Sequence, residues 1–158
     1  MERGHAVGVL AYDPHKDQVV LVNELRPGIL AAGGAPFSDA LIAGAIDSGE
    51  NAVQAAVREM REEAGLELAA PRVVIERLYV SPGGTSESIT LVYGTVTAPV
   101  ESAVHGNPDE KENIRTSILS ARQFANRIRR GEINDMKTVL AGYWLMANRA
   151  RLRREHEP

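Results

Sequence analysis

The sequence predicts an α+β fold with a mixed sheet, and two observations support this class. Short apolar runs typical of strands lie on both sides of one long segment whose apolar residues recur with the period of a helix. These segments do not alternate in the regular strand–helix order of a doubly wound parallel sheet. The chain has 158 residues, 44% hydrophobic and 25% charged, which predicts one globular domain over residues 1–158.

The first part of the chain predicts a hairpin. Residues 6–12 and 18–26 are apolar runs, and the cluster of Asp, Pro and His between them, at 13–17, is typical of a turn. Residues 27–39 contain three Gly and two Pro, so we expect a loop there. The apolar run 40–46 that follows predicts a short strand.

A helix is predicted over residues 51–64. Its apolar residues fall on one face, at Val53, Ala56, Val57, Met60 and Ala64. Polar side chains just before it are expected to cap its N-terminus, namely Asp47, Ser48 and Glu50. Gly65 is a suitable residue for the C-terminal stop.

The rest of the chain predicts three strands and two helices. The strands cover 72–80, 88–96 and 114–119, with a Pro-Gly turn between the first two and a polar loop before the third. The helices cover 120–130 and 136–153.

Composition excludes several classes of function. The chain contains no cysteine, which excludes a disulfide framework, a thiol nucleophile and cysteine-ligated zinc, and fits a cytoplasmic location. No apolar run is long enough to cross a membrane, so we expect no membrane association. The net charge is −3 and aromatic residues make up only 4%, which argues against a nucleic-acid partner.

Three carboxylates gather on the predicted helix 51–64. Glu59 and Glu63 are four residues apart and share one face, and Glu62 lies beside them. Oxygen ligands at this spacing suit a hard divalent cation, Mg²⁺ or Mn²⁺. Arg58 is four residues before Glu62 and can hold it by an ion pair. The alternative is an ordinary solvated helix face, which would carry no chemistry.

The wider pattern over residues 44–66, GAIDSGENAVQAAVREMREEAGL, resembles the Nudix box without a mismatch. Its fixed positions are Gly44, Glu50, Arg58, Glu59, Met60, Glu62, Glu63, Gly65 and Leu66. The resemblance implies a mixed sheet between helices and the hydrolysis of a nucleoside diphosphate linked to another moiety. Such chemistry uses metal ions to neutralise the pyrophosphate, orient it and acidify a water.

The resemblance also implies roles for single residues. Glu59, Glu62 and Glu63 match the positions that hold catalytic Mg²⁺, and the carbonyl of Ala43 matches a backbone ligand seen in several members. Glu50 matches the first glutamate of the box, which is more often structural. Mn²⁺ is the second candidate for the metal.

Sequence outside the box resembles one branch of the family, the ADP-ribose pyrophosphatases and the related GDP-mannose hydrolases. The segment 81–87, SPGGTSE, places Pro82 sixteen residues after Leu66, as in that branch. There the glutamate that matches Glu87 binds substrate or shapes the site, so Glu87 and Gly84 are candidate substrate-binding residues. The alternative is an ordinary Pro-Gly turn between strands.

Two further segments match the same branch. Arg26 matches a strand-end arginine that contacts phosphate, for which a guanidinium is well suited; the alternative is a surface ion pair. In the loop 109–115, the residue that matches Glu110 acts as general base and the one that matches Glu112 approaches the metal. A solvated acidic loop is the alternative there. Glu62 remains a second candidate for the base.

This sequence departs from the branch at two points. Members usually carry a small β domain before the first strand that builds the dimer and part of the nucleoside pocket, and no matching segment is found here, so a homodimer is left open. Ala40 stands where many relatives have Glu. We expect Mg²⁺-dependent hydrolysis of ADP-ribose to AMP and ribose 5-phosphate. The alternatives are GDP-mannose or another nucleotide sugar, or a domain that binds nucleotide without turnover.

Overall fold

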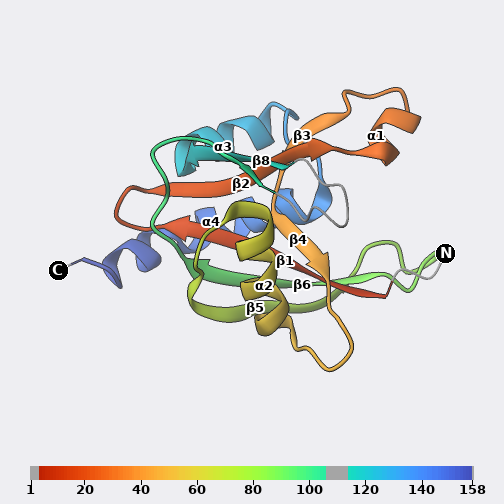
Figure 1. Cartoon of the computed structure of the whole chain (residues 1–158). Coiled ribbons are helices and arrows are strands. Elements are labelled where there is room, and N and C mark those ends of the chain that lie inside the picture. The colour runs from red at the N-terminus through yellow and green to blue at the C-terminus, as the bar shows by residue number, and fades with distance from the viewer. Residues whose placement is uncertain (1–3, 106–113, 158) are drawn as a thin grey trace.

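One mixed sheet of eight strands, with helices on both of its faces, forms the described part of the chain (Figure 1). The structure is a computed structural model and describes residues 4–105 and 114–157. The strands are β1 (His5–Asp13), β2 (Gln18–Leu25), β3 (Phe37–Ala40), β4 (Ile42–Ala45), β5 (Ala69–Tyr79), β6 (Ser88–Thr95), β7 (Val104–His105) and β8 (Ile114–Ser120). The helices are α1 (Pro27–Ala31), α2 (Ala52–Ala64), α3 (Ala121–Arg129) and α4 (Met136–Arg154).

The sheet runs in the order β5-β6-β1-β2-β8-β7, with β3 paired to β2 and β4 paired to β1. Strands β1 and β6 are parallel, whereas the other pairs are antiparallel. This arrangement confirms the α+β class with a mixed sheet. The predicted strands at 6–12, 18–26, 72–80, 88–96 and 114–119 are all present within a few residues of their expected bounds.

The predicted hairpin is confirmed, but its two strands separate soon after the turn. They pair only from Ala11↔Val20 to Asp13↔Gln18, and the Asp13 carboxylate accepts hydrogen bonds from the backbone of the turn. Beyond this point β4 pairs with β1, and β3 pairs with β2. Strands β3 and β4 therefore lie where β1 and β2 diverge, and β4 carries Gly44 at the start of the box.

The predicted loop over 27–39 is wrong in part. Pro27 begins the short helix α1, where its missing N–H costs nothing, and β3 pairs with β2 from Leu25↔Phe37 to Val22↔Ala40. The Gly and Pro residues of this segment favoured a loop prediction, but β3 forms because it pairs with β2. The strand expected over 40–46 accordingly begins at Ile42, after a break at Leu41.

Helix α2 is confirmed, with a different cap from the one expected. The cap is Asn51 rather than Asp47, Ser48 or Glu50. The Asn51 side chain accepts hydrogen bonds from the backbone N–H groups of Val53 and Gln54, and the Gln54 side chain accepts one from the Asn51 N–H. This reciprocal pair satisfies donors at the helix start. Gly65 ends the helix in the left-handed region at φ 64°, as predicted.

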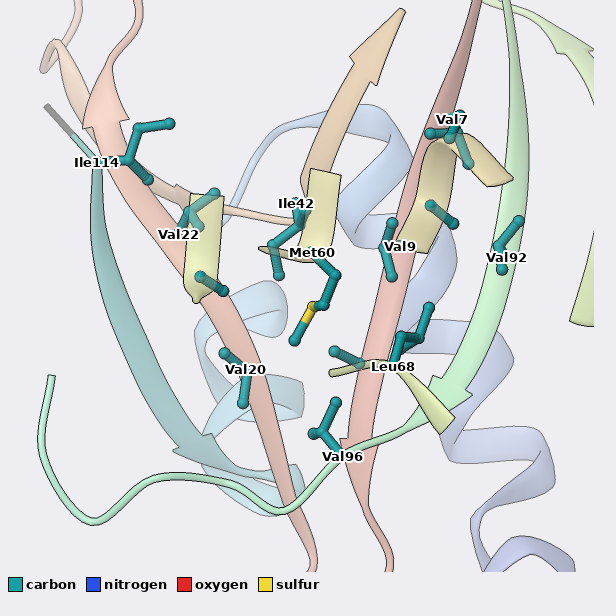
Figure 2. Packing of buried hydrophobic residues seen from close by; sticks show 14 of the residues in the cluster. Val7, Val9, Val20, Val22, Ile42, Met60, Leu68, Val92, Val96 and Ile114 are labelled. Atoms are coloured by element: carbon teal, nitrogen blue, oxygen red, sulfur yellow. The ribbon is translucent and has the colours of Figure 1, made fainter. Parts of the chain in front are cut away.

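Two apolar layers hold the helices to the sheet. On one face, Met60 of α2 points into side chains that include Val9, Val20 and Ile42 (Figure 2). On the other face, α3 and α4 pack on residues of the opposite parity, including Leu10 and Tyr12. Within the described residues no helix is long and apolar enough to cross a membrane. Helix α2 is thus fixed by its buried face, which places its carboxylates against β4.

Candidate active site

Glu59 and Glu63 lie between α2 and β4. They are only 8% and 4% exposed, although both are carboxylates. The backbone N–H of Ala43 donates to Glu63 Oε2 at 3.2 Å. These values contradict a solvated helix face for these two residues, because a carboxylate is buried only where partners compensate its desolvation.

Gly44 makes room for the Glu59 carboxylate. A Cβ built at Gly44 would lie 1.7 Å from Glu59 Oε1 and 2.1 Å from its Cδ. The carboxylate therefore rests directly on the β4 backbone, at a place that another residue would fill. This contact gives a physical reason for the glycine that opens the box.

Arg58 joins the carboxylates of the box. Its Nε and Nη2 bind Glu50 in a fork at 3.1 and 2.9 Å. Its Nη1 donates to Glu59 Oε1 at 2.6 Å and to Glu62 Oε2 at 3.4 Å, which confirms the expected pair with Glu62. Nη2 also donates to the carbonyl of Ala45 at 2.9 Å, so Arg58 connects α2 to the end of β4.

The forked bond affects the ionisation of both partners. Hydrogen bonds from the Arg58 guanidinium hold the pKa of the Glu50 carboxyl below its ordinary value. The Glu50 hydrogen bonds in turn raise the pKa of Arg58. Both groups are charged near neutral pH, and Glu50 is occupied by Arg58 rather than directed toward a metal, which fits the structural role implied for it.

The donor set of the box fits a hard divalent cation. Glu59, Glu62 and Glu63 supply carboxylate oxygens from one helix, and Arg58 forms ion pairs with Glu59 and Glu62. Among the described residues, no three acidic or histidine side chains already converge as a metal-binding group.

Arg26 lies at the end of β2 and pairs with a neighbouring carboxylate. Its Nη1 is 2.6 Å from Glu24 Oε1, and its backbone N–H donates to the carbonyl of Pro36, which extends the β2–β3 ladder. Its Nη2 is buried and has no hydrogen-bond partner. Ala40, which stands where many relatives have Glu, is fully buried in β3 and pairs with Val22.

The turn at 81–87 lies across β1 from the box. The backbone N–H groups of Gly84 and Thr85 donate to the carbonyl of Ser81, and Val80 N–H donates to the carbonyl of Glu87. Ser88, the next residue, pairs with His5 of β1, whose carbonyl accepts from Ile46 on the other side. The backbones of Glu87 and β4 are therefore about two strand spacings, roughly 10 Å, apart. Glu110 and Glu112 lie outside the described residues.

Two residues near Arg26 and the box, Glu24 and Asn51, were not predicted from the sequence. Glu24 could have been found from its spacing, because residues 24 and 26 fall on the same face of a strand. Asn51 could have been found as the first residue of an Asn-x-x-Gln capping pattern. In both cases the partner is close in sequence and of the complementary type.

Comparison with known proteins agrees with the geometry. The family model of the NUDIX domain matches residues 2–138, and the chain belongs to the Nudix family. The ADP-ribose pyrophosphatase of Escherichia coli (strain K12) is 37% identical over 154 residues, covering 98% of this chain and 73% of that protein. The ADP-ribose pyrophosphatase of Haemophilus influenzae is 33% identical over 153 residues, covering 95% and 70%.

Two other matches agree with the Nudix family and its fold. The GDP-mannose pyrophosphatase of Citrobacter koseri is 35% identical over 143 residues, covering 88% of this chain and 72% of that protein. A solved structure described as an ADP compounds hydrolase superposes with a TM-score of 0.72 at 21% identity, over 92% of this chain and 76% of that one. The structural match supports the Nudix fold.

Proposed function

We propose that this chain is a pyrophosphohydrolase that cleaves ADP-ribose to AMP and ribose 5-phosphate. The observation that carries the proposal is the buried pair Glu59 and Glu63, held against β4 by Gly44, Ala43 and Arg58. A chain that only bound nucleotide would not need every carboxylate of the box, and all of them are present here. The two ADP-ribose pyrophosphatases at 37% and 33% identity support this substrate.

Glu59, Glu62 and Glu63, with the carbonyl of Ala43, would hold a divalent cation, for which we propose Mg²⁺, with Mn²⁺ as a substitute. When bound, the cation neutralises the diphosphate and acidifies a water. Arg58 would then retain its forked bond to Glu50 while releasing Glu59 and Glu62. This keeps α2 attached to the end of β4 while the carboxylates are in use.

We assign the general base to Glu110, with Glu62 as the second candidate. In the reaction a water adds to one phosphorus, its proton passes to the base, and the bond between that phosphorus and the bridging oxygen breaks. The carboxylates on α2 are expected to be committed to metal, and a ligand is a weaker base. Glu112 would approach the metal from the same loop. These assignments rest on the resemblance of the sequence.

Arg26 would contact the substrate from the end of β2, and Glu87 and Gly84 would contact it from the turn before β6. Arg26 is supported by its buried Nη2, a donor without a partner. Glu87 and Gly84 are supported by the register that brings their turn near β4. ADP-ribose should therefore be preferred over a nucleoside triphosphate in kcat/KM.

The test is a panel of substrates with purified protein, Mg²⁺ or Mn²⁺, and a readout of phosphate after phosphatase treatment. Cleavage of ADP-ribose, with Glu63→Gln lowering the rate by orders of magnitude, would support the proposal. Glutamine still accepts a bond from Ala43 N–H, so the variant should remain folded. The matched control is Glu67→Gln, a 74% exposed residue just beyond the same helix. Absence of any turnover would favour a domain that binds nucleotide without cleaving it.

GDP-mannose is the second candidate, because one GDP-mannose pyrophosphatase is 35% identical to this chain. The same panel separates it from ADP-ribose by the ratio of kcat/KM values. A cytoplasmic location, a homodimer and a single domain over 1–158 remain predictions from the sequence. Size-exclusion chromatography with light scattering tests the homodimer.

A further inference from the structure

Two buried polar groups lie at the same end of the β2–β3 strand pair, near Leu25↔Phe37. Arg26 Nη2 and Ser38 Oγ are both shielded from water and have no hydrogen-bond partner. An unsatisfied buried donor or hydroxyl costs about 1–3 kcal/mol, and native proteins contain few of them. Two such groups in one short strand pair suggest that a ligand completes them.

Register places both groups on the face that carries the box. Ser38 pairs directly with Glu24, whose carboxylate lies 2.6 Å from Arg26 Nη1. Side chains alternate along a strand, so Glu24 shares the face of Val22, which packs under α2. Ser38 and Ala43 are five positions apart in the sequence, so they lie at most about 17 Å from each other. A substrate with its diphosphate at the box can reach Ser38 with a sugar.

Charge indicates what the ligand offers. Arg26 is already paired with Glu24, so the pair has almost no net charge to attract a phosphate. The pair offers the two unused N–H groups of Arg26 Nη2 and, beside them, a carboxylate that can accept, and Ser38 can both donate and accept. Neighbouring hydroxyls, each of which donates and accepts, match this set better than an anionic oxygen does.

We propose that Ser38, together with Arg26 and Glu24, binds the cis-diol of a ribose in the substrate. This inference rests on the proposed function and names a specificity residue within it. Helix α1, which follows Arg26, has no buried residue, so it can yield as the sugar enters. The ribose can come from the adenosine or from the terminal sugar, and the experiment separates these sources.

The experiment measures inhibition of ADP-ribose hydrolysis by AMP and by ribose 5-phosphate, each with its 2-deoxy and 3-deoxy analogue. Wild type should bind one of the two parent compounds about 3–10-fold better than its deoxy analogues, the effect of one neutral hydrogen bond. Ser38→Ala should abolish that difference and raise KM by a similar factor with little change in kcat. Ser38→Thr, which keeps the hydroxyl, should restore it. The compound that loses its preference identifies the ribose.

Ser117→Ala is the matched control, since Ser117 pairs with Leu21 on the opposite face of the sheet. It should leave KM and both preferences unchanged. If Ser38→Ala weakens the parent and deoxy compounds equally, Ser38 contacts phosphate and the proposal is wrong. Unchanged inhibition in Ser38→Ala would also overturn it. If wild type does not cleave ADP-ribose at all, it is the proposed function that fails.

Discussion

Gly44 and Arg58 position the box carboxylates from two sides. Gly44 leaves the space in which Glu59 rests on β4, and Arg58 binds Glu50, Glu59 and Glu62 at once. The first residue acts by lacking a side chain, and the second by presenting a planar fork of donors. The geometry of Glu59 therefore depends on two residues that need not touch the substrate.

Gly44→Ala should impair activity more than stability. The added Cβ would push the Glu59 carboxylate from its place, and a displacement of about 1 Å can cost about 10²-fold in rate. Overpacking should cost roughly 1–3 kcal/mol in the free energy of unfolding. Steady-state kinetics and urea unfolding measure both. Gly8→Ala is the control, because its Cβ would lie at an ordinary 3.4 Å from Leu41; equal losses in the two variants would contradict the prediction.

Arg58→Lys should not preserve function, although it keeps the charge. A single ammonium cannot reproduce the fork to Glu50 together with the bond to Glu59, so the free energy of unfolding should fall by roughly 1–3 kcal/mol and kcat should fall with it. Thermal unfolding and kinetics provide the measurements. Arg61→Lys, at an exposed pair on the same helix, should behave like wild type. A fully active Arg58→Lys protein would show that the fork is dispensable.

Among the elements, the three longer helices α2, α3 and α4 begin at side-chain caps that the sequence encodes locally. Asn51 and Ser120 each form a reciprocal capping pair, with Gln54 and Gln123. Asp135 caps α4 by accepting from the backbone and hydroxyl of Thr138. Such caps contribute about 0.5–2 kcal/mol each and fix where a helix starts. For α2, the position of the cap fixes where Glu59 and Glu63 lie along the helix and therefore which part of β4 they face.

Asp135→Asn should lower stability at neutral pH but not in acid. Burial opposes ionisation of Asp135, but Lys137 and the bonds from Thr138 outweigh it and hold its pKa below the ordinary value. A depressed carboxyl pKa adds stability that is present above about pH 4 and is lost as pH falls through the folded value. The variant should therefore be about 1 kcal/mol less stable at pH 7, and the deficit should shrink below pH 4.

Urea unfolding between pH 2 and pH 8 measures this difference. Asparagine keeps the cap, so the variant isolates the charge. Glu101→Gln, at an exposed residue, should track wild type at every pH. A deficit in Asp135→Asn that stays constant with pH would show that the charge of Asp135 contributes nothing.

At the scale of the whole molecule, the β1–β2 turn is tied to the far end of α4. Arg149 donates to both oxygens of Asp17, at 2.7 and 2.5 Å, and Tyr12 donates to Asp17 Oδ1 at 2.7 Å. The turn lies at the opposite end of β1 from Val7, which pairs with Gly44. Six residues of strand, about 20 Å, separate this tie from the box. The bonds of Asp17 to Arg149 and Tyr12 therefore stabilise the fold at a distance from the box.

Arg149→Met should lower stability without lowering kcat. Arg149 is 38% exposed, so solvent screening limits the loss to about 1 kcal/mol in the free energy of unfolding. Its distance from the box leaves the carboxylates undisturbed. Thermal unfolding and steady-state kinetics on the same preparation test the separation. Arg154→Met, an exposed residue on the same helix, is the control. A matching fall in kcat would show that the two ends of the sheet are coupled.

The α+β class, most of the helices and strands, and the residues of the box could all be predicted from the sequence. These features depend on local causes: apolar period, turn residues and the fixed spacing of carboxylates along one helix. Features that depend on contacts between residues far apart in sequence, or on a partner strand, could be seen only in the tertiary structure. Strand β3, which follows a segment rich in Gly and Pro, forms because it pairs with β2. Glu59 and Glu63 are buried because β4 covers them. Ser38 lies opposite Glu24, the partner of Arg26, because of the register of β2 and β3. This register depends on the packing of the whole sheet.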